Sequence, residues 1–323
     1  MFLAFSCTLL KNTQKALDVE ALFPWIGVVS LILVFLIIDL GIFNKIPHAI
    51  SMREALEMSV VWISLALGFN LAVWYWKGGE PALAFFTGYL LEKLLSLDNM
   101  FVFLIIFNFF NIHPRHQHRI LFWGILGAIV FRLLLILLGI KLIQTFDWIL
   151  YIFGLLLIYS SYKVFKERNK PAEIEANAFI LWARKWIPIR ENYKGRRFFL
   201  YRDGKWLATP IFLVLMTIEV SDIVFAIDSI PAIFGITLDP FIVFTSNIFA
   251  ILGLRSLYFL LAHILPRFYY LQHALAVILG FIGIKLILTQ HVDIPLWTSL
   301  AVITVTLFIA ILASLRRTKN NSY

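Results

Sequence analysis

The sequence predicts an all-α polytopic membrane protein with about nine transmembrane helices. Of its 323 residues, 61% are hydrophobic and only 15% are charged, whereas a soluble domain carries roughly a quarter charged residues. Apolar stretches of about 18 or more residues, each long enough to cross a bilayer as a helix, recur along the whole chain. The predicted spans are 24–43, 57–76, 83–109, 120–142, 146–165, 208–230, 241–263, 271–289 and 296–315.

The distribution of basic residues predicts the orientation. The net charge of +9 would, taken alone, also suit a nucleic-acid-binding protein. With nine spans, however, the termini lie on opposite sides, and most lysines and arginines fall on the C-terminal side. The positive-inside rule then makes the C-terminus cytoplasmic and the N-terminus external, and no nucleic-acid partner is expected. The basic residues on the C-terminal side include Lys45, Arg53, Arg115, Arg119, Arg267, Arg316, Arg317 and Lys319.

The segment 166–207 is the one sizeable stretch between spans. Pro171 marks a helix start, and the aromatic and basic residues after it predict a helix on the membrane surface. Asp203-Gly204 lies between aromatic stretches and predicts a hairpin. We interpret the segment as a basic cytoplasmic linker, with a regulatory or partner-binding role as the alternative. The whole chain, 1–323, is expected to form a single transmembrane domain.

Two stretches on either side of this segment, 83–165 and 208–289, resemble each other. In each, two acids six residues apart precede a span with a central arginine, and a third span contains a glycine. The matching residues are Glu92, Asp98, Arg132 and Gly154 in the first copy, and Asp222, Asp228, Arg255 and Gly280 in the second. A unit of three spans crosses the membrane an odd number of times, so its copy is inverted. Inverted repeats place transporter sites near the midplane between the copies. The final helix, 296–315, follows the second copy.

Acidic residues inside the predicted spans point to a function. Each acid at a helix centre opposes membrane insertion by roughly 2.5–3.5 kcal/mol, so such residues face the bundle interior, a cavity or a partner. The acids are Asp39, Glu92, Asp98, Glu219, Asp222 and Asp228, against the central bases Arg132, Arg255 and Lys285. The acids can pair with the bases and hold helices together, but their surplus favours binding of protons or cations. Asp98 and Asp228 lie about 120° from the other acids, and we expect unwinding at Pro231 to turn Asp228 inward.

The side chains around these acids predict the class of cation. Carboxylate, amide and hydroxyl oxygens are hard donors that suit Mg²⁺, Ca²⁺ or Mn²⁺, whereas zinc or copper sites contain histidine or cysteine. Asn99 joins the six acids as a predicted metal ligand, and the predicted supporting residues are Ser96, Ser221, Ser229 and Asn247, with the bases Arg132, Arg255 and Lys285. The single cysteine, Cys7, excludes an intramolecular disulfide. We expect no permanent cofactor and no enzymatic activity, because no Ser-His, Cys-His or HExxH arrangement is present.

The acidic motifs resemble those of a known family. "EKLLSLDNMFVF" at Glu92, "EVSDIVFAIDSIPAIFGIT" at Glu219, "DPFIVFTSNIFAILGLRSLYFLLA" over 239–262, and Asp39 in "IIDLGIF" are similar to the TerC family of integral membrane proteins, especially its Alx-like branch. The resemblance covers about Phe23 to Leu315. It implies a bacterial inner-membrane protein of nine helices, related to the LysE-type transporter superfamily, with a role in manganese efflux and metal homeostasis and an older label of tellurium resistance. It assigns the motif acids to Asp39, Glu92, Asp98, Glu219, Asp222 and Asp228.

These observations leave two main functional hypotheses. The first is a transporter that exports divalent cations, Mn²⁺ foremost, through a carboxylate-lined midplane site, with Glu92 and Glu219 as proton carriers if export is coupled to proton entry. The second is a membrane scaffold that assists insertion or metalation of other proteins, with 166–207 as its docking surface. The expected partners are divalent metal ions and membrane lipids. Protons and a second copy of the chain are left open as partners.

Overall fold

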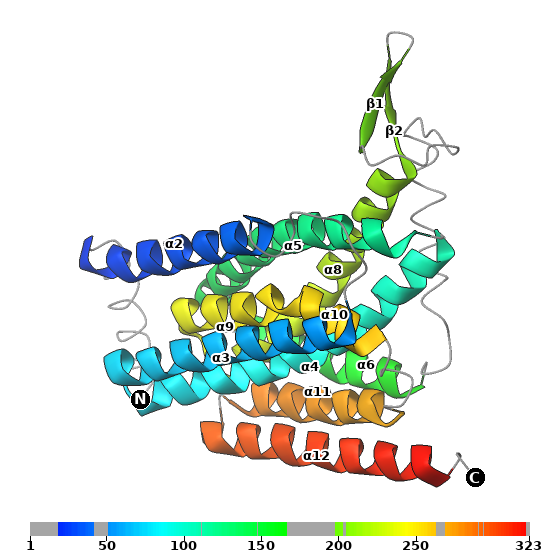
Figure 1. Cartoon of the computed structure of the whole chain (residues 1–323). Helices are drawn as coiled ribbons and strands as arrows, with labels where there is room; N and C mark the ends of the chain where they lie inside the picture. Colours follow the sequence, from blue (N-terminus) through cyan, green and yellow to red (C-terminus); the bar gives the residue numbers. More distant parts are fainter. Residues whose placement is uncertain are drawn as a thin grey trace. The chain divides into compact units, whose positions relative to one another are not determined.

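The structure is a computed structural model that describes residues 19–41, 51–110, 112–146, 148–166, 198–202, 205–262, 269–289, 291–292 and 294–320. Nearly all of these residues are helical (Figure 1). The chain divides into two compact units, Met1–Pro47 and His48–Tyr323. In the first unit the structure describes one helix, α2 (Val19–Gly41). All other described elements belong to the second unit.

The second unit consists of nine helices and a short hairpin within its described residues. Its elements are α3 (Met52–Lys77), α4 (Gly79–Phe109), α5 (Pro114–Thr145), α6 (Ile149–Lys166), β1 (Phe199–Arg202), β2 (Lys205–Ala208), α8 (Pro210–Phe234), α9 (Pro240–Leu252), α10 (Leu254–Ala262), α11 (Leu271–Leu288) and α12 (Leu296–Asn320). Several helices begin where the local sequence dictates. Thr209 and Asp239 accept hydrogen bonds from the first-turn amides of α8 and α9, and a proline follows each.

Six of the described helices are long and apolar enough to cross a membrane, and the bent pair α9–α10 makes up to seven. Large apolar side chains such as Leu71, Trp74 and Phe308 are exposed on these helices, as expected for surfaces that face lipid. The chain is therefore an all-α multi-pass membrane protein, as the sequence predicted. The predicted number of nine spans is not confirmed. The helix α4 is 31 residues long but contains Glu92, Lys93 and Asp98 within seven consecutive residues.

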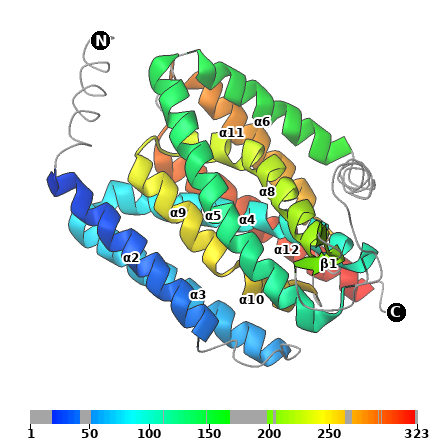
Figure 2. The same cartoon turned by 90° about the horizontal axis from the view of Figure 1, so that it is seen from above.

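The helices of the second unit pack in pairs that join distant parts of the sequence. In Figure 2, α6 lies along α11, and α5 lies against α8. The helix α9 packs against α4, and α12 covers α11. The buried core includes Phe107, Ile120 and Val214 in one cluster and Leu157 and Ile278 in another. The centre of the bundle is thus built by the two predicted copies together, with α4, α5, α8 and α9 around it.

The helices α6 and α11 approach so closely at Gly154 and Gly283 that their main chains touch. A Cβ atom added at either glycine would lie 2.8 Å from the carbonyl oxygen of the other. Small residues at a crossing allow membrane helices to approach this closely. Nearby, the Ser161 hydroxyl of α6 donates a hydrogen bond to the Ala276 carbonyl of α11 at 2.7 Å. Gly280, the predicted counterpart of Gly154, lies against Ser161.

Two details of the predicted spans are corrected by the structure. The stretch 241–263 is not one straight span, because α9 ends at Leu252 and α10 begins at Leu254 with a bend of about 40°. Conversely, α8 does not unwind at Pro231 but continues to Phe234. Proline removes one amide donor, here the one that would bond the Ile227 carbonyl, yet the helical backbone continues for three residues beyond it.

A two-stranded antiparallel sheet forms at the Asp203-Gly204 signal. Strand β1 pairs with β2 so that Arg202 lies opposite Lys205, and Figure 1 shows the hairpin extending from the N-terminal end of α8. Residues 203–204 themselves lie outside the described part of the chain. The predicted surface helix after Pro171 also falls outside it, within 167–197.

Candidate functional site

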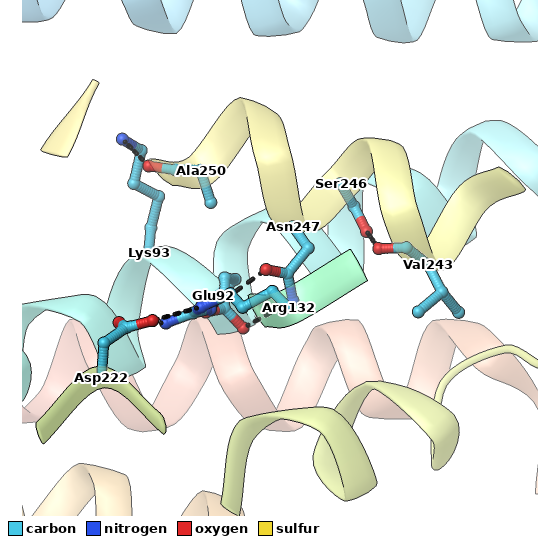
Figure 3. Close-up of polar contacts among 8 residues, drawn as sticks. All are labelled: Glu92, Lys93, Arg132, Asp222, Val243, Ser246, Asn247 and Ala250. Carbon is cyan, nitrogen blue, oxygen red and sulfur yellow. Dashed lines mark hydrogen bonds and ion pairs between the residues drawn. The ribbon is translucent and has the colours of Figure 1, made fainter. Parts of the chain in front are cut away.

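A buried arginine lies at the centre of the bundle. Arg132 of α5 is 1% exposed and donates hydrogen bonds from two nitrogens to the Asp222 carboxylate of α8. Its Nε donates to Oδ2 at 3.2 Å and its Nη2 donates to Oδ1 at 3.0 Å, as Figure 3 shows. This two-pronged arrangement is the strong, geometrically specific form of an arginine–carboxylate pair.

Two further helices complete the contacts of Arg132. Its Nη1 forms an ion pair with Glu92 of α4 and donates a hydrogen bond to Oδ1 of Asn247 in α9 at 3.0 Å. The Asn247 amide in turn donates to Oε2 of Glu92 at 3.3 Å. We call Glu92, Arg132, Asp222 and Asn247 the Arg132 network. It ties four helices together, two from each predicted copy.

The charges within the Arg132 network do not balance. When Glu92 and Asp222 are both ionised, two negative groups share one guanidinium. All four members are buried, so water screens this excess poorly. Removing a charged group from water costs several kcal/mol per ion unless partners compensate for it. A proton on one of the carboxyl groups or an additional cation balances this excess.

A third carboxyl group lies beside the network. Glu219 precedes Asp222 by one helical turn on α8 and is 7% exposed. Its Oε2 has no hydrogen-bond partner within the described part of the chain. The carboxyl group rests against Gly127 of α5, where an added Cβ atom would overlap it. Gly127 is therefore the residue that makes room for Glu219.

Other predicted oxygen donors are also buried on α4 and α8. The hydroxyls of Ser96 and Ser229 are 0% and 1% exposed, and within the described residues neither has a hydrogen-bond partner. Asn99 is buried as well. Ser221, in contrast, donates to the Thr217 carbonyl of its own helix at 2.8 Å.

Asp228 does not join the Arg132 network, contrary to the expected inward turn. Because α8 stays helical through Pro231, Asp228 keeps its phase and faces α6, where it accepts a hydrogen bond from the Ser160 hydroxyl at 2.7 Å. Lys285 also contacts no member of the network: it donates to the Ser299 hydroxyl at 2.8 Å. Arg255 is buried at the start of α10.

Two predicted metal ligands lie beyond the described side chains. The side chains of Asp39 and Asp98 lie outside the described part of the structure, although their main chains belong to α2 and α4. Among the side chains that are described, no group of three or more His, Cys, Asp or Glu residues is arranged to hold a metal ion. Glu92 and Asp222 converge as predicted, but Arg132 lies between them.

Two residues beside the site were not predicted from the sequence. Gly127 was one of several glycines in apolar helices, and only the position of Glu219 distinguishes it. Lys93 follows Glu92 and donates a hydrogen bond to the Ala250 carbonyl of α9 at 2.8 Å. The sequence could have indicated Lys93, because it is a lysine next to an acid inside an apolar span.

Comparison with known proteins assigns the chain to a family. The model of the integral membrane protein TerC family matches residues 77–322, which contain every residue of the Arg132 network. The chain belongs to the TerC family. The match includes both predicted copies and the final helix, so the TerC assignment rests on the same part of the chain as the site. No solved structure matches this TerC protein.

Relatives of this TerC protein match it over most of their length. The "Uncharacterized membrane protein STKORF319" of Myxococcus xanthus is 46% identical over 92% of this chain and 93% of its own. The Escherichia coli K12 protein named "Putative membrane-bound redox modulator Alx" is 43% identical over 86% of this chain and 90% of its own. A protein of the same name from Salmonella typhi is 43% identical over 88% of this chain and 92% of its own.

Proposed function

We propose that this TerC protein is a transporter that exports divalent metal cations, Mn²⁺ foremost, through a site around the Arg132 network. The observation that carries the proposal is the buried surplus of negative charge. Glu92 and Asp222 share one arginine, and the neighbouring Glu219 has a carboxyl oxygen without a hydrogen-bond partner in the described structure. Intramembrane acids of this kind mark ion pathways.

The donor set supports a hard cation as cargo. The oxygens of the site are the carboxylates of Glu219 and Asp222 and the amide of Asn247, and the buried hydroxyls of Ser96 and Ser229 lie on the same helices, α4 and α8. Oxygen ligands suit Mn²⁺, Mg²⁺ and Ca²⁺ rather than zinc or copper. Manganese is placed first because of the family resemblance, and Mg²⁺ is the competitor that an experiment must separate from it.

In this proposal, Arg132 supplies the positive charge that pairs with Glu92 and Asp222 when no metal ion is bound. Its guanidinium fills the space between Glu92 and Asp222, so a metal ion cannot bind both carboxylates while Arg132 holds them. A divalent cation brings twice the charge of arginine and displaces it from at least one carboxylate. Binding of cargo is thereby coupled to the release of contacts between α5 and α8, which is a movement that alternating access requires.

The inverted repeat is also part of the proposal, and the helix pairing supports it. Exchanging the two copies replaces α4 with α8, α5 with α9–α10, and α6 with α11. The observed pairs α4–α9 and α5–α8 exchange with each other under this operation, and the α6–α11 pair maps onto itself. The reciprocal contact of Gly154 and Gly283 lies within the α6–α11 pair. We place the protein in a bacterial inner membrane, with its C-terminus in the cytoplasm as the basic residues indicate.

Flux of Mn²⁺ in proteoliposomes tests the proposal. We expect the wild-type protein to move Mn²⁺ across the membrane, and Asp222→Asn to reduce the rate at least about tenfold, because the variant loses a charge that must stabilise the cation. Gly127→Ala is expected to reduce the rate as well, since the new methyl group displaces Glu219 while every network residue is retained.

Gly124→Ala is the matched control for the glycine substitution. Gly124 lies one turn earlier on α5, and its added Cβ would meet the Ile218 side chain at 3.3 Å and the Leu215 side chain at 4.0 Å, neither of which belongs to the site. We expect this variant to transport Mn²⁺ within about twofold of the wild type. Wild-type flux no faster than in protein-free vesicles would refute transport, and equal rates in the Gly127 and Gly124 variants would remove Glu219 from the site.

The scaffold hypothesis remains a second candidate because the 166–207 segment presents a separate surface. Its described part forms the β1–β2 hairpin, on which Phe199 and Tyr201 are exposed. Deleting 167–205 distinguishes the two functions. A scaffold loses its activity in cells while Mn²⁺ flux in vesicles is retained, whereas a transporter whose loop is only a linker keeps both.

The names of the Alx relatives raise a redox role for this chain as well. Thiol–disulfide exchange within one chain needs two cysteines, and the sequence contains only Cys7. We therefore propose that any effect of this protein on cellular redox state is indirect and follows from the concentration of the metal that it exports.

A further inference from the structure

The bent span α9–α10 is interrupted inside the bundle. Leu252, Gly253 and Leu254 around the break are all buried, so the end of α9 lies inside the bundle. The last four carbonyls of a helix lack partners within it and carry partial negative charge. Left without a donor in an apolar interior, such a group costs about 1–3 kcal/mol. The break therefore needs a positive or hydrogen-bonding group from elsewhere.

Lys93 supplies this group from another helix. Its ammonium donates a hydrogen bond to the Ala250 carbonyl at 2.8 Å, a carbonyl that would accept from the Leu254 amide in an unbroken helix. Figure 3 shows Glu92 and Lys93 pointing in different directions, the first toward Arg132 and the second toward Ala250. The acceptor of Lys93 is thus the end of a helix rather than a carboxylate.

The residues around the Lys93 ammonium leave space for a group of its size. A Cβ atom added at Gly253 would lie 3.0 Å from the Lys93 Nζ and 3.0 Å from the Cβ of Trp62. The ring of Tyr89 lies on another side, with its centroid 5.6 Å from Nζ, within the range of a cation–π interaction. The absence of a side chain at Gly253 therefore leaves room for one compact cation at the end of α9.

We propose that the ammonium group of Lys93 takes the place of a bound monovalent metal ion at the α9–α10 break. In transporters with broken helices, exposed main-chain carbonyls and the C-terminal ends of half-helices coordinate Na⁺. Here the side-chain nitrogen of Lys93, tethered to α4, occupies the corresponding place. The wild-type protein thus has no use for Na⁺ or K⁺ at this break, and removal of the ammonium creates a binding site for one of them. The inference does not depend on which cation the protein exports.

Thermal unfolding of the full chain in detergent tests this inference. The midpoint is measured in choline chloride, NaCl and KCl at equal ionic strength. We expect the wild-type midpoint to be the same in all three salts. Lys93→Ala is expected to unfold about 3–8 °C lower in choline chloride and to recover at least half of that loss in NaCl or KCl, saturating with concentration as a bound ligand does.

Two matched variants separate cation binding from a general effect. Lys93→Met fills the space of the lysine stem without charge, so its midpoint is expected to be low in all three salts. Lys285 is a second buried lysine that donates to a side-chain hydroxyl, that of Ser299, and not to a broken helix. Lys285→Ala is therefore expected to lose stability with no recovery in Na⁺ or K⁺.

The inference is overturned if the Lys93→Ala midpoint is equally low in all three salts, because Lys93 would then only satisfy a carbonyl. It is also overturned if the wild-type midpoint rises in NaCl or KCl over choline chloride. If Lys93→Ala does not fold, Lys93→Ser replaces it, since the serine leaves the same space and adds an oxygen ligand. A Lys93→Ser midpoint that does not respond to Na⁺ or K⁺ contradicts the inference equally.

Discussion

Replacing Arg132 with methionine is expected to lower the free energy of unfolding by about 3–5 kcal/mol, because it leaves two buried carboxylates without their partner. Arg132 makes a two-pronged contact with Asp222, an ion pair with Glu92 and a hydrogen bond to Asn247. Methionine preserves much of the side-chain volume and removes the charge. Thermal or chemical unfolding in detergent measures the loss.

A variant that removes all three charges is the control for this prediction. Combining Arg132→Met with Glu92→Gln and Asp222→Asn removes every charge of the Arg132 network, so the triple variant is expected to be more stable than Arg132→Met alone. The difference isolates the cost of unpaired carboxylates from the loss of packing. If the triple variant is less stable than the single one, the carboxylates are not the cause, and our description of the network is wrong.

Replacing Gly283 with leucine is expected to destabilise the protein by about 3 kcal/mol, at the upper end of the usual cost of overpacking. The first atom of the new side chain would lie 2.8 Å from the Gly154 carbonyl oxygen and 3.0 Å from the Leu157 Cβ. These obstacles are a main-chain atom and the first atom of a side chain, so a change of rotamer cannot remove them. The helices α6 and α11 must separate, and we expect a lower unfolding midpoint and a smaller folded fraction.

Gly68 provides the comparison for Gly283. An added Cβ at Gly68 of α3 meets nothing within 4 Å, so Gly68→Leu is expected to remain within about 1 kcal/mol of the wild type, with a gain from the higher helix propensity of leucine. Equal unfolding midpoints for the Gly283 and Gly68 variants would show that the glycine crossing is not required for stability.

Much of the site was predictable because its residue types are costly in a membrane. Glu92, Asp222 and Arg132 were recognisable from sequence as charged residues inside apolar spans, and the structure brings them together. The sequence pattern left open whether the acids face a cation or an arginine. That choice depends on the distance between α4, α5 and α8, which no local pattern encodes.

The errors had a different physical origin. The helical phase alone placed Asp228 away from the other acids, and the expectation that Pro231 would unwind α8 reversed a correct inference. The break at Gly253 was missed because the surrounding residues are as apolar as any continuous span. Its stabilising group, Lys93, lies 157 residues before the Ala250 carbonyl that it contacts, and such long-range pairs are not readable from local sequence.

Isothermal titration of the purified protein with Mn²⁺ tests most directly whether the surplus carboxylates around Arg132 bind a divalent cation. We expect one saturable site in the wild type, at least about tenfold weaker binding in Asp222→Asn, and unchanged binding in Asp228→Asn, because Asp228 lies on the same helix but faces Ser160. The absence of saturable binding to the wild type, or equal affinity in the wild-type and Asp222→Asn proteins, would contradict the account.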